Sequence, residues 1–154
     1  MKILMVCLGN ICRSPMAEGI LRRRAQQAGL VITIDSAGTS SNHMGQAPDQ
    51  RAAQAMRAYG IDITDLRARQ FTSADLDGYD RIFAMDNSNL DDIRELAVND
   101  DQLKKVSLLM DLVPNGPARN VPDPYYGGQE GFDEVFRMLD QASSLLVEEL
   151  RTRG

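Results

Sequence analysis

Apolar residues along the chain fall into two patterns that alternate. Short and nearly continuous apolar runs are typical of strands buried on both faces of a sheet, whereas apolar residues at every third or fourth position indicate helices. The runs predict strands at residues 2–7, 31–35, 79–85 and 106–109. The helical spacing predicts helices at residues 15–28, 49–60, 88–97 and 132–150. Strand and helix therefore alternate from one end of the chain to the other.

Residues suited to helix ends support these boundaries. Ser14 and Asp49 are good N-caps, and Pro15 suits the first position of a helix, where no N–H is needed. A glycine follows the expected end of the first helix and another follows the second. A capping-box pattern at residues 72–75 predicts one further helical start.

Alternating strands and helices predict an α/β fold with a parallel sheet covered on both faces. Such sheets bind ligands beyond the carboxyl ends of their strands. Residues 113–128 are rich in proline and glycine and show no period, and a loop of this length in a compact domain is usually functional. The length of the chain is that of one domain, so we expect a single domain over residues 1–154.

Composition narrows the possible partners. The net charge of −5 argues against nucleic acid as a ligand. No apolar run approaches the length of a membrane span and no signal peptide opens the chain, so no membrane association is expected. The two cysteines, Cys7 and Cys12, lie close together and do not form a disulfide framework. A working thiol favours a cytoplasmic location, where the compartment is reducing.

The segment that joins the first strand to the first helix has the features of an anion site. Its residues from Cys7 read CLGNICRS, and a loop in this place directs free peptide N–H groups and the positive helix end at one spot. The positive potential favours the nucleophilic thiolate of Cys7. The planar fork of Arg13 suits two phosphate oxygens. Gly9 permits a close backbone approach, and Asn10 tolerates a left-handed conformation.

These residues carry a resemblance to a known family. CLGNICRSPMAE, which begins at Cys7, contains Cys-x5-Arg-Ser, and Asp123-Pro124-Tyr125-Tyr126 lies far downstream. With Asp35-Ser36-Ala37-Gly38 and Met85-Asp86-Asn87-Ser88-Asn89-Leu90, they resemble the low-molecular-weight protein tyrosine phosphatase family over nearly the whole chain. The resemblance implies a three-layer, Rossmann-like fold whose four parallel strands have the order 2-1-3-4. It also implies hydrolysis of phosphotyrosine and aryl phosphate monoesters without a metal or cofactor.

The resemblance assigns roles to individual residues. Cys7 would attack phosphorus and form a phosphocysteine, while Arg13 and the loop amides hold the phosphoryl oxygens. Asp123, between two stiffening prolines, would protonate the leaving phenolate and later activate water. The implied substrate-binding residues are Leu8, Gly9, Asn10, Ile11, Cys12, Ser14, Asn42, Tyr125 and Tyr126. Ser14 would also donate to the Cys7 sulfur. Phosphotyrosine proteins are the implied partners, and a cognate tyrosine kinase is one candidate among them.

The chain departs from the family at one position. The family commonly places an aromatic residue in the loop after the second strand, whereas this chain has Asn42 there and contains no tryptophan. One wall of the substrate cleft is therefore predicted to be polar. His43, the only histidine, is expected to be a solvated loop residue, and Ser36 to be structural.

Each assignment has a structural alternative. Cys7 could be a buried core cysteine, and Asp123 a turn residue between prolines. Cys12 stays open between simple packing and the trapping of oxidised Cys7 as a disulfide. The tyrosine pair could be ordinary loop packing.

Other functions fit these residues less well. An arsenate reductase on this fold needs a further cysteine downstream of Cys12, and none follows. Phosphoarginine phosphatases of the family carry Thr in place of Ile11 and lack the tyrosine pair. A phosphate-binding docking module would not need Asp123. A Cys–His hydrolase would have to place His43 beside Cys7, and the Gly-x4-Gly-Lys-Ser/Thr loop of nucleotide binders is absent.

Overall fold

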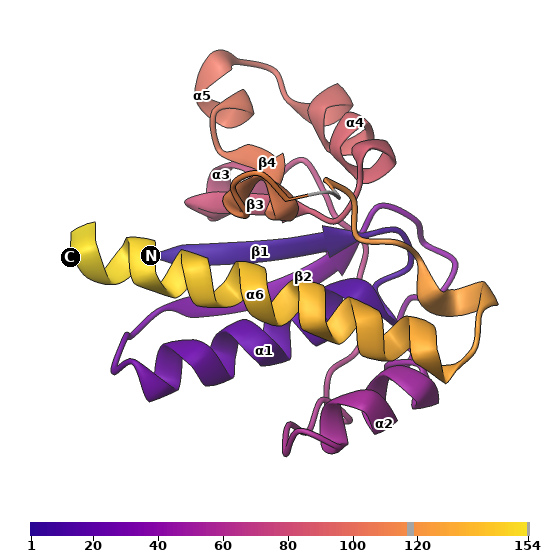
Figure 1. Ribbon diagram of the computed structural model, residues 1–154. Helices are drawn as coiled ribbons and strands as arrows, with labels where there is room; N and C mark the ends of the chain where they lie inside the picture. The colour runs from indigo at the N-terminus through magenta and orange to yellow at the C-terminus, as the bar shows by residue number, and fades with distance from the viewer. Residues whose placement is uncertain (117–118, 154) are drawn as a thin grey trace.

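Four parallel strands form the central sheet of the computed structural model, which describes residues 1–116 and 119–153 (Figure 1). The strands are β1 (Lys2–Cys7), β2 (Thr33–Gly38), β3 (Arg81–Ala84) and β4 (Val106–Leu108). Their order in the sheet is β2-β1-β3-β4, and each neighbouring pair is parallel. The predicted fold class and strand order are confirmed.

β1 occupies the middle of the sheet because its apolar side chains face both ways. Ile3 and Met5 belong to one buried cluster, and Leu4 and Val6 to another, so alternate residues of one strand supply two cores. β2 pairs with one edge of β1 and β3 with the other. The order of the strands therefore reverses at β1, and the strand ends at Cys7, where sheets of this kind bind their ligands.

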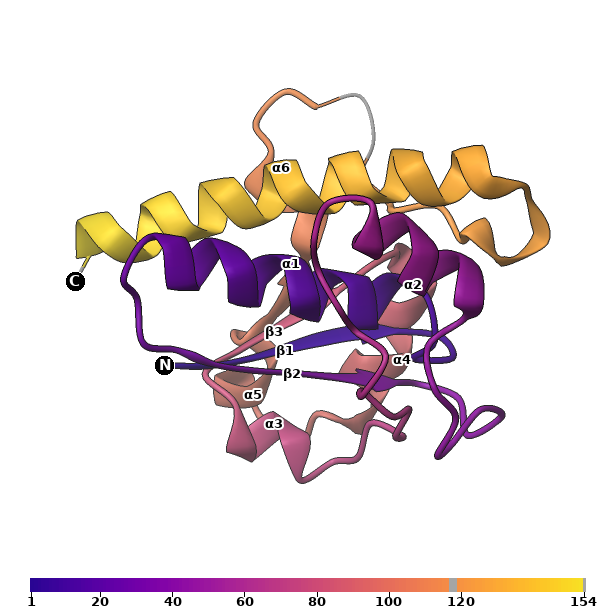
Figure 2. The ribbon, with the colours of Figure 1, turned by 90° about the horizontal axis from the view of Figure 1, so that it is seen from below.

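Helices cover both faces of the sheet and give three layers. One face carries α1 (Arg13–Gln27), α2 (Gln50–Arg57) and the long α6 (Gln129–Arg153), and Figure 2 shows α6 lying along α1. The other face carries α3 (Asp75–Gly78), α4 (Asn87–Leu96) and α5 (Asp100–Leu103). Two 3-10 turns, η1 (Leu109–Leu112) and η2 (Pro124–Tyr126), complete the chain. The apolar stripe predicted for the last helix is confirmed, since its residues from Phe132 to Leu146 face the core.

The first helix begins earlier than predicted. α1 starts at Arg13, its N-cap position is Cys12, and no side chain caps it. The prediction of Ser14 as the N-cap, with Pro15 at the first helical position, is therefore wrong. The Ser14 hydroxyl contacts the Cys7 sulfur instead, because both side chains point to the inside of the curled loop.

The second strand and the second helix also have other bounds than predicted. Val31 is 98% exposed, so the second strand begins at Thr33 and continues to Gly38, where it still pairs with β1. The second helix ends at Arg57, and Tyr59 lies beyond it with its ring stacked on Phe136 at a centroid distance of 3.8 Å. An apolar residue can therefore continue the spacing of a helix after the helix has ended.

The other sequence predictions concern a capping box, a long loop and membrane spans. In the predicted capping box, the Thr72 N–H donates to the Asp75 carboxylate at 2.8 Å, and α3 begins at Asp75. The expected loop at residues 113–128 contains η2, and its residues 117 and 118, like residue 154, lie outside the described part of the chain. Within residues 1–116 and 119–153, no helix combines the length and apolar character needed to cross a membrane.

Candidate active site

The segment between β1 and α1 curls around the sulfur of Cys7. Cys7 is the last residue of β1 and is buried. The Asn10 N–H donates to Cys7 Sγ at 3.3 Å, and the Ser14 hydroxyl lies 2.9 Å from the same sulfur. Ser14 Oγ accepts a hydrogen bond from the Asn10 amide at 2.7 Å, and its own proton has two acceptors in reach, the Cys7 sulfur and the Ala37 carbonyl at 3.4 Å. We call residues 8–12, between Cys7 and Arg13, the anion loop.

Asn10 fixes the shape of the anion loop. Its φ of 58° lies in the left-handed region, as predicted from the sequence. Besides Ser14, its side-chain amide donates to Ser36 Oγ at 3.0 Å, and its oxygen accepts the Arg69 N–H at 3.0 Å. One buried side chain thus joins the loop to β2 and to the segment before α3.

The network continues from Ser36 into α1. Ser36 donates to the buried carboxylate of Glu18 at 2.7 Å, and Arg22 donates to the other oxygen of the same carboxylate at 2.6 Å. Burial raises the pKa of Glu18, and the hydrogen bonds from Ser36 and Arg22 oppose that shift. Ser36 was expected to be structural, and its contacts show that it links the sheet to α1.

Arg13 is held by partners that lie far along the chain. Its guanidinium is 3% exposed and donates through Nη1 to Asp86 at 2.6 Å and to the Val121 carbonyl at 3.0 Å. Nη2 lies 3.8 Å from Asp123 Oδ2. Asp86 also caps α4 by accepting the Asn89 N–H at 2.8 Å, so it is itself fixed. Asp86 was not among the predicted site residues. Its place just after β3, the neighbour of β1, is a sequence signal for a site residue, because ligands bind beyond that edge of the sheet.

Asp123 reaches the site from the turn before α6. Its Oδ1 accepts the Tyr125 N–H at 3.0 Å, which caps η2, while Oδ2 faces Arg13. The carboxylate is about one-third exposed. Tyr125 and Tyr126 follow it with their rings 5.0 Å apart and nearly perpendicular. The Cys7 thiol, the Arg13 guanidinium and the Asp123 carboxylate are therefore brought together from two segments of the chain, the β1–α1 connection and the turn before α6.

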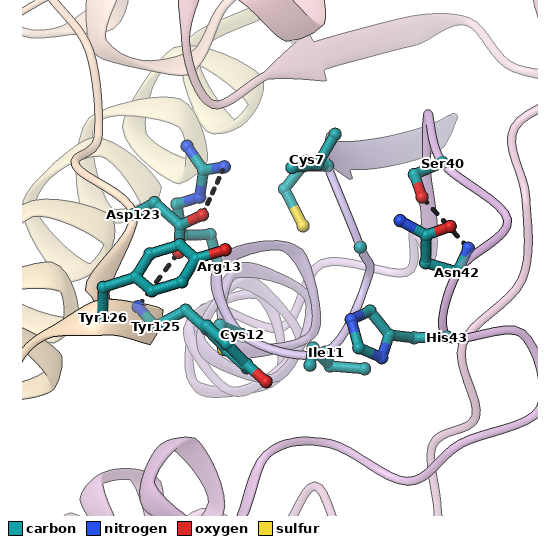
Figure 3. A pocket seen from close by; sticks show the side chains of 12 residues that line it. Cys7, Ile11, Cys12, Arg13, Ser40, Asn42, His43, Asp123, Tyr125 and Tyr126 are labelled. Atoms are coloured by element: carbon teal, nitrogen blue, oxygen red, sulfur yellow. Dashed lines mark hydrogen bonds and ion pairs between the residues drawn. The ribbon is translucent and has the colours of Figure 1, made fainter.

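These side chains surround one cavity of about 180 Å³ (Figure 3). It is lined by Cys7, Leu8, Gly9, Ile11, Cys12, Arg13, Ser40, Asn42, His43, Asp123, Tyr125 and Tyr126. Of the twelve predicted site residues, ten line the cavity, whereas Asn10 and Ser14 do not line it and hold the loop through their hydrogen bonds. In the described part of the chain, no three His, Cys, Asp or Glu side chains are grouped so as to hold a metal ion.

Comparison with known proteins decides the family. A family model described as low molecular weight phosphotyrosine protein phosphatase matches residues 2–154. The chain belongs to this family. Membership places it among the protein-tyrosine phosphatases, which are hydrolases.

Relatives of this family match over nearly their full lengths. The low molecular weight protein-tyrosine-phosphatase of Streptomyces coelicolor is 40% identical, over 97% of this chain and 93% of its own. The crystal structure of a protein tyrosine phosphatase from Entamoeba histolytica has a TM-score of 0.93 and 38% identity, and covers 99% of this chain and 97% of its own. A drosophila arginine phosphatase is also similar, with a TM-score of 0.92, 32% identity and 98% coverage of both chains.

The side of the cavity formed by the loop after β2 contains a residue that was not expected there. Asn42 lines the cavity, as expected, and its N–H donates to Ser40 Oγ at 3.0 Å. His43 lies in a loop, as expected, but it is half-buried and lines the cavity, and its ring lies 6.3 Å from that of Tyr125. A Cβ placed on Gly9 would lie only 2.9 Å from His43 Cδ2. The glycine therefore makes room for the ring.

Cys12 is the second thiol of the phosphatase site. It is buried and free, as is Cys7. Burial raises the pKa of Cys12 well above the ordinary range, and the negative charge of nearby Asp49 adds to the shift. The Cys12 thiol therefore stays protonated at neutral pH.

Proposed function

We propose that this protein hydrolyses phosphotyrosine and aryl phosphate monoesters through a phosphocysteine intermediate on Cys7. One observation supports this most strongly: Cys7, Arg13 and Asp123 line the same cavity as a pair of tyrosine rings. A passive phosphate site would need the first two residues but would not need a carboxyl group beside them.

In the first step, the Cys7 thiolate attacks phosphorus as the bond from phosphorus to the phenolic oxygen breaks. The amides of the anion loop and the Arg13 guanidinium hold the equatorial oxygens, where negative charge develops. Asp123 donates its proton to the departing phenolate oxygen, which leaves as a neutral phenol. Because Asp86 and the Val121 carbonyl already orient Arg13, little reorganisation is needed when the anion arrives.

In the second step, water attacks the phosphocysteine. The Asp123 carboxylate accepts a proton from this water, and inorganic phosphate leaves as the Cys7 thiolate is restored. The Ser14 hydroxyl, 2.9 Å from the sulfur, donates a hydrogen bond as negative charge returns to it.

The rest of the cavity supports an aryl substrate. The rings of Tyr125 and His43 face the same space, and Ile11 contributes apolar surface beside them. The physiological partners would be phosphotyrosine proteins, with a cognate tyrosine kinase as one candidate. Two free thiols in one site favour a reducing, cytoplasmic compartment.

A panel of phosphorylated substrates tests the proposal. We expect turnover of phosphotyrosine peptides and aryl phosphates in the presence of EDTA, and a phosphate adduct on the Cys7 peptide after rapid acid quench. Cys7→Ser should abolish turnover while inorganic phosphate still binds, because the loop amides and Arg13 remain. Faster hydrolysis of phosphoarginine than of phosphotyrosine would show that the proposed substrate class is wrong. Wild-type turnover by Cys7→Ser would show that the nucleophile is wrong.

A further inference from the structure

Arg51 lies between the anion loop and the turn that carries Asp123. It is near the start of α2, whose N-cap is Asp49. The Asp49 N–H donates to the Ile11 carbonyl of the anion loop at 2.8 Å. Its carboxylate accepts from Arg51 Nε at 3.1 Å and from Nη2 at 3.0 Å. Arg51 is therefore fixed, through Asp49, to the loop that surrounds the Cys7 sulfur.

The other side of the same guanidinium holds the turn that carries Asp123. Nη2 donates to the Tyr125 carbonyl at 2.9 Å, and Nη1 donates to the Gly127 carbonyl at 3.1 Å. The guanidinium carbon also lies 5.5 Å from the centroid of the Tyr125 ring and 4.8 Å from that of Phe132. Arg51 thus contacts η2 through one hydrogen bond and the face of the Tyr125 ring, and contacts the C-cap Gly127 through a second hydrogen bond.

Tyr125 transmits this contact to the carboxyl group. Its carbonyl accepts from Arg51, and its N–H donates to Asp123 Oδ1 at 3.0 Å. A shift of this residue would therefore move the hydrogen bond that orients Asp123. A displacement of about 1 Å at a reacting group is enough to cost about 100-fold in rate.

From this geometry we infer that Arg51 is a positioning residue, which holds Asp123 in place relative to the anion loop for proton donation. The inference rests on the role proposed above for Asp123. Capping of α2 does not explain the arrangement, because the Asp49 carboxylate already accepts the Arg51 N–H at 2.8 Å. The guanidinium instead binds Asp49 and two carbonyls of a distant turn, which its planar fork with five donors allows.

The test compares Arg51→Met with Arg57→Met. Methionine keeps part of the apolar stem of arginine and removes the donors, and Arg57 is an exposed arginine of the same helix. For phenyl phosphate, whose phenolate leaves poorly, we expect Arg51→Met to lower kcat/KM, which reports the steps up to release of the phenol, about 10-fold. For p-nitrophenyl phosphate, which needs less protonation, the loss should stay within about twofold. Arg57→Met should match the wild type with both substrates.

A double-mutant cycle identifies the path of the effect. If Arg51 acts through Asp123, then Arg51→Met in an Asp123→Asn background should cost less than about twofold with phenyl phosphate. The inhibition constant of inorganic phosphate should stay within about twofold of the wild type, because the anion loop is intact. Arg51→Gln provides a second variant if the methionine variant does not fold.

Several results would overturn the inference. An equal loss of kcat/KM in both backgrounds, an equal loss of kcat/KM with both substrates, or no loss would show that Arg51 does not position the proton donor. Weaker phosphate inhibition would place its effect in the anion loop. If Asp123→Asn alone shows no dependence on the leaving group, the proposed proton donor is wrong and the inference falls with it. That outcome can be told apart from a failure of the Arg51 inference, because it is measured in a protein that keeps Arg51.

Discussion

Asn10 shows how much of the site depends on single buried polar residues. Its left-handed backbone directs the anion loop around the Cys7 sulfur, and its side chain satisfies Ser14, Ser36 and the Arg69 N–H together. Asparagine is suited to both tasks, since it tolerates positive φ and offers a donor and an acceptor at once. Glycine would adopt the same backbone conformation but would leave three polar groups without this partner.

At Asp123, the proposed mechanism makes a sharp prediction. Asp123→Asn keeps the shape of the side chain but removes the transferable proton, so kcat/KM for phenyl phosphate, which reports the steps up to release of the phenol, should fall by about 10²–10⁴-fold. The loss should be much smaller for p-nitrophenyl phosphate, and the basic limb of the pH–rate profile should flatten. A deficit that is the same for both leaving groups, with the basic limb intact, would mean that another residue supplies the proton.

At His43, we predict a contribution to substrate affinity. Its ring lines the cavity near Tyr125, so His43→Ala should raise KM for aryl phosphates by about 2- to 10-fold, the equivalent of about 0.5–1.5 kcal/mol for one aromatic contact. The neighbouring Met44 is exposed and does not line the cavity, and Met44→Ala serves as the control. An unchanged KM in steady-state assays of His43→Ala would leave Tyr125 and Tyr126 as the aromatic wall.

For Cys12, we predict a protective role during oxidation. Peroxide converts the Cys7 thiolate to sulfenic acid, and the Cys12 thiol can then condense with it to a disulfide and release water. Activity should therefore return when a dithiol is added. Mass spectrometry of the oxidised protein distinguishes the outcomes: a Cys7–Cys12 disulfide supports the prediction, and sulfinic or sulfonic acid on Cys7 with an untouched Cys12 contradicts it.

At the scale of elements, the ends of strands and helices were harder to predict than their presence. The apolar run of β1 and the stripe of α6 are strong local signals, and both elements appear where the sequence placed them. β2 was misplaced because Val31 continues an apolar run although it is exposed, while Ser36 enters the strand although it is polar. Its hydroxyl is satisfied by Asn10 and Glu18, which are partners from elsewhere in the chain.

The link between α1 and β2 predicts a pH dependence of stability. Burial raises the pKa of Glu18 in the folded state, so the folded protein retains this proton at a pH where the unfolded chain has lost it. The free energy of unfolding should therefore fall as the pH rises from the ordinary value of 4.5 through the raised one. Glu18→Gln should remove this fall. Urea unfolding at about pH 4.5 and at about pH 8 gives the free energy of unfolding of the wild type and of Glu18→Gln. An equal loss of stability in the two proteins would contradict the raised pKa of Glu18.

At the scale of the whole molecule, the sheet explains why residues distant in sequence meet. β1 and β3 are neighbours and end at the same edge, so Cys7 and Asp86 lie close together. That part of the site follows from an α/β pattern with the sheet order known. The contacts of Arg13 with Val121, and of Arg51 with the turn before α6, do not follow from any local pattern, because they depend on how a loop folds back over the sheet edge.

The central position of β1 also has a consequence for synthesis on the ribosome. β1 is made before all its neighbours, and both of its hydrogen-bonding edges stay open until β2 and then β3 have left the ribosome. The residues of the anion loop are made long before Asp123, the proposed proton donor, and α6, which covers α1, follows that residue. During synthesis, the chain therefore carries the proposed nucleophile well before it carries the proposed proton donor.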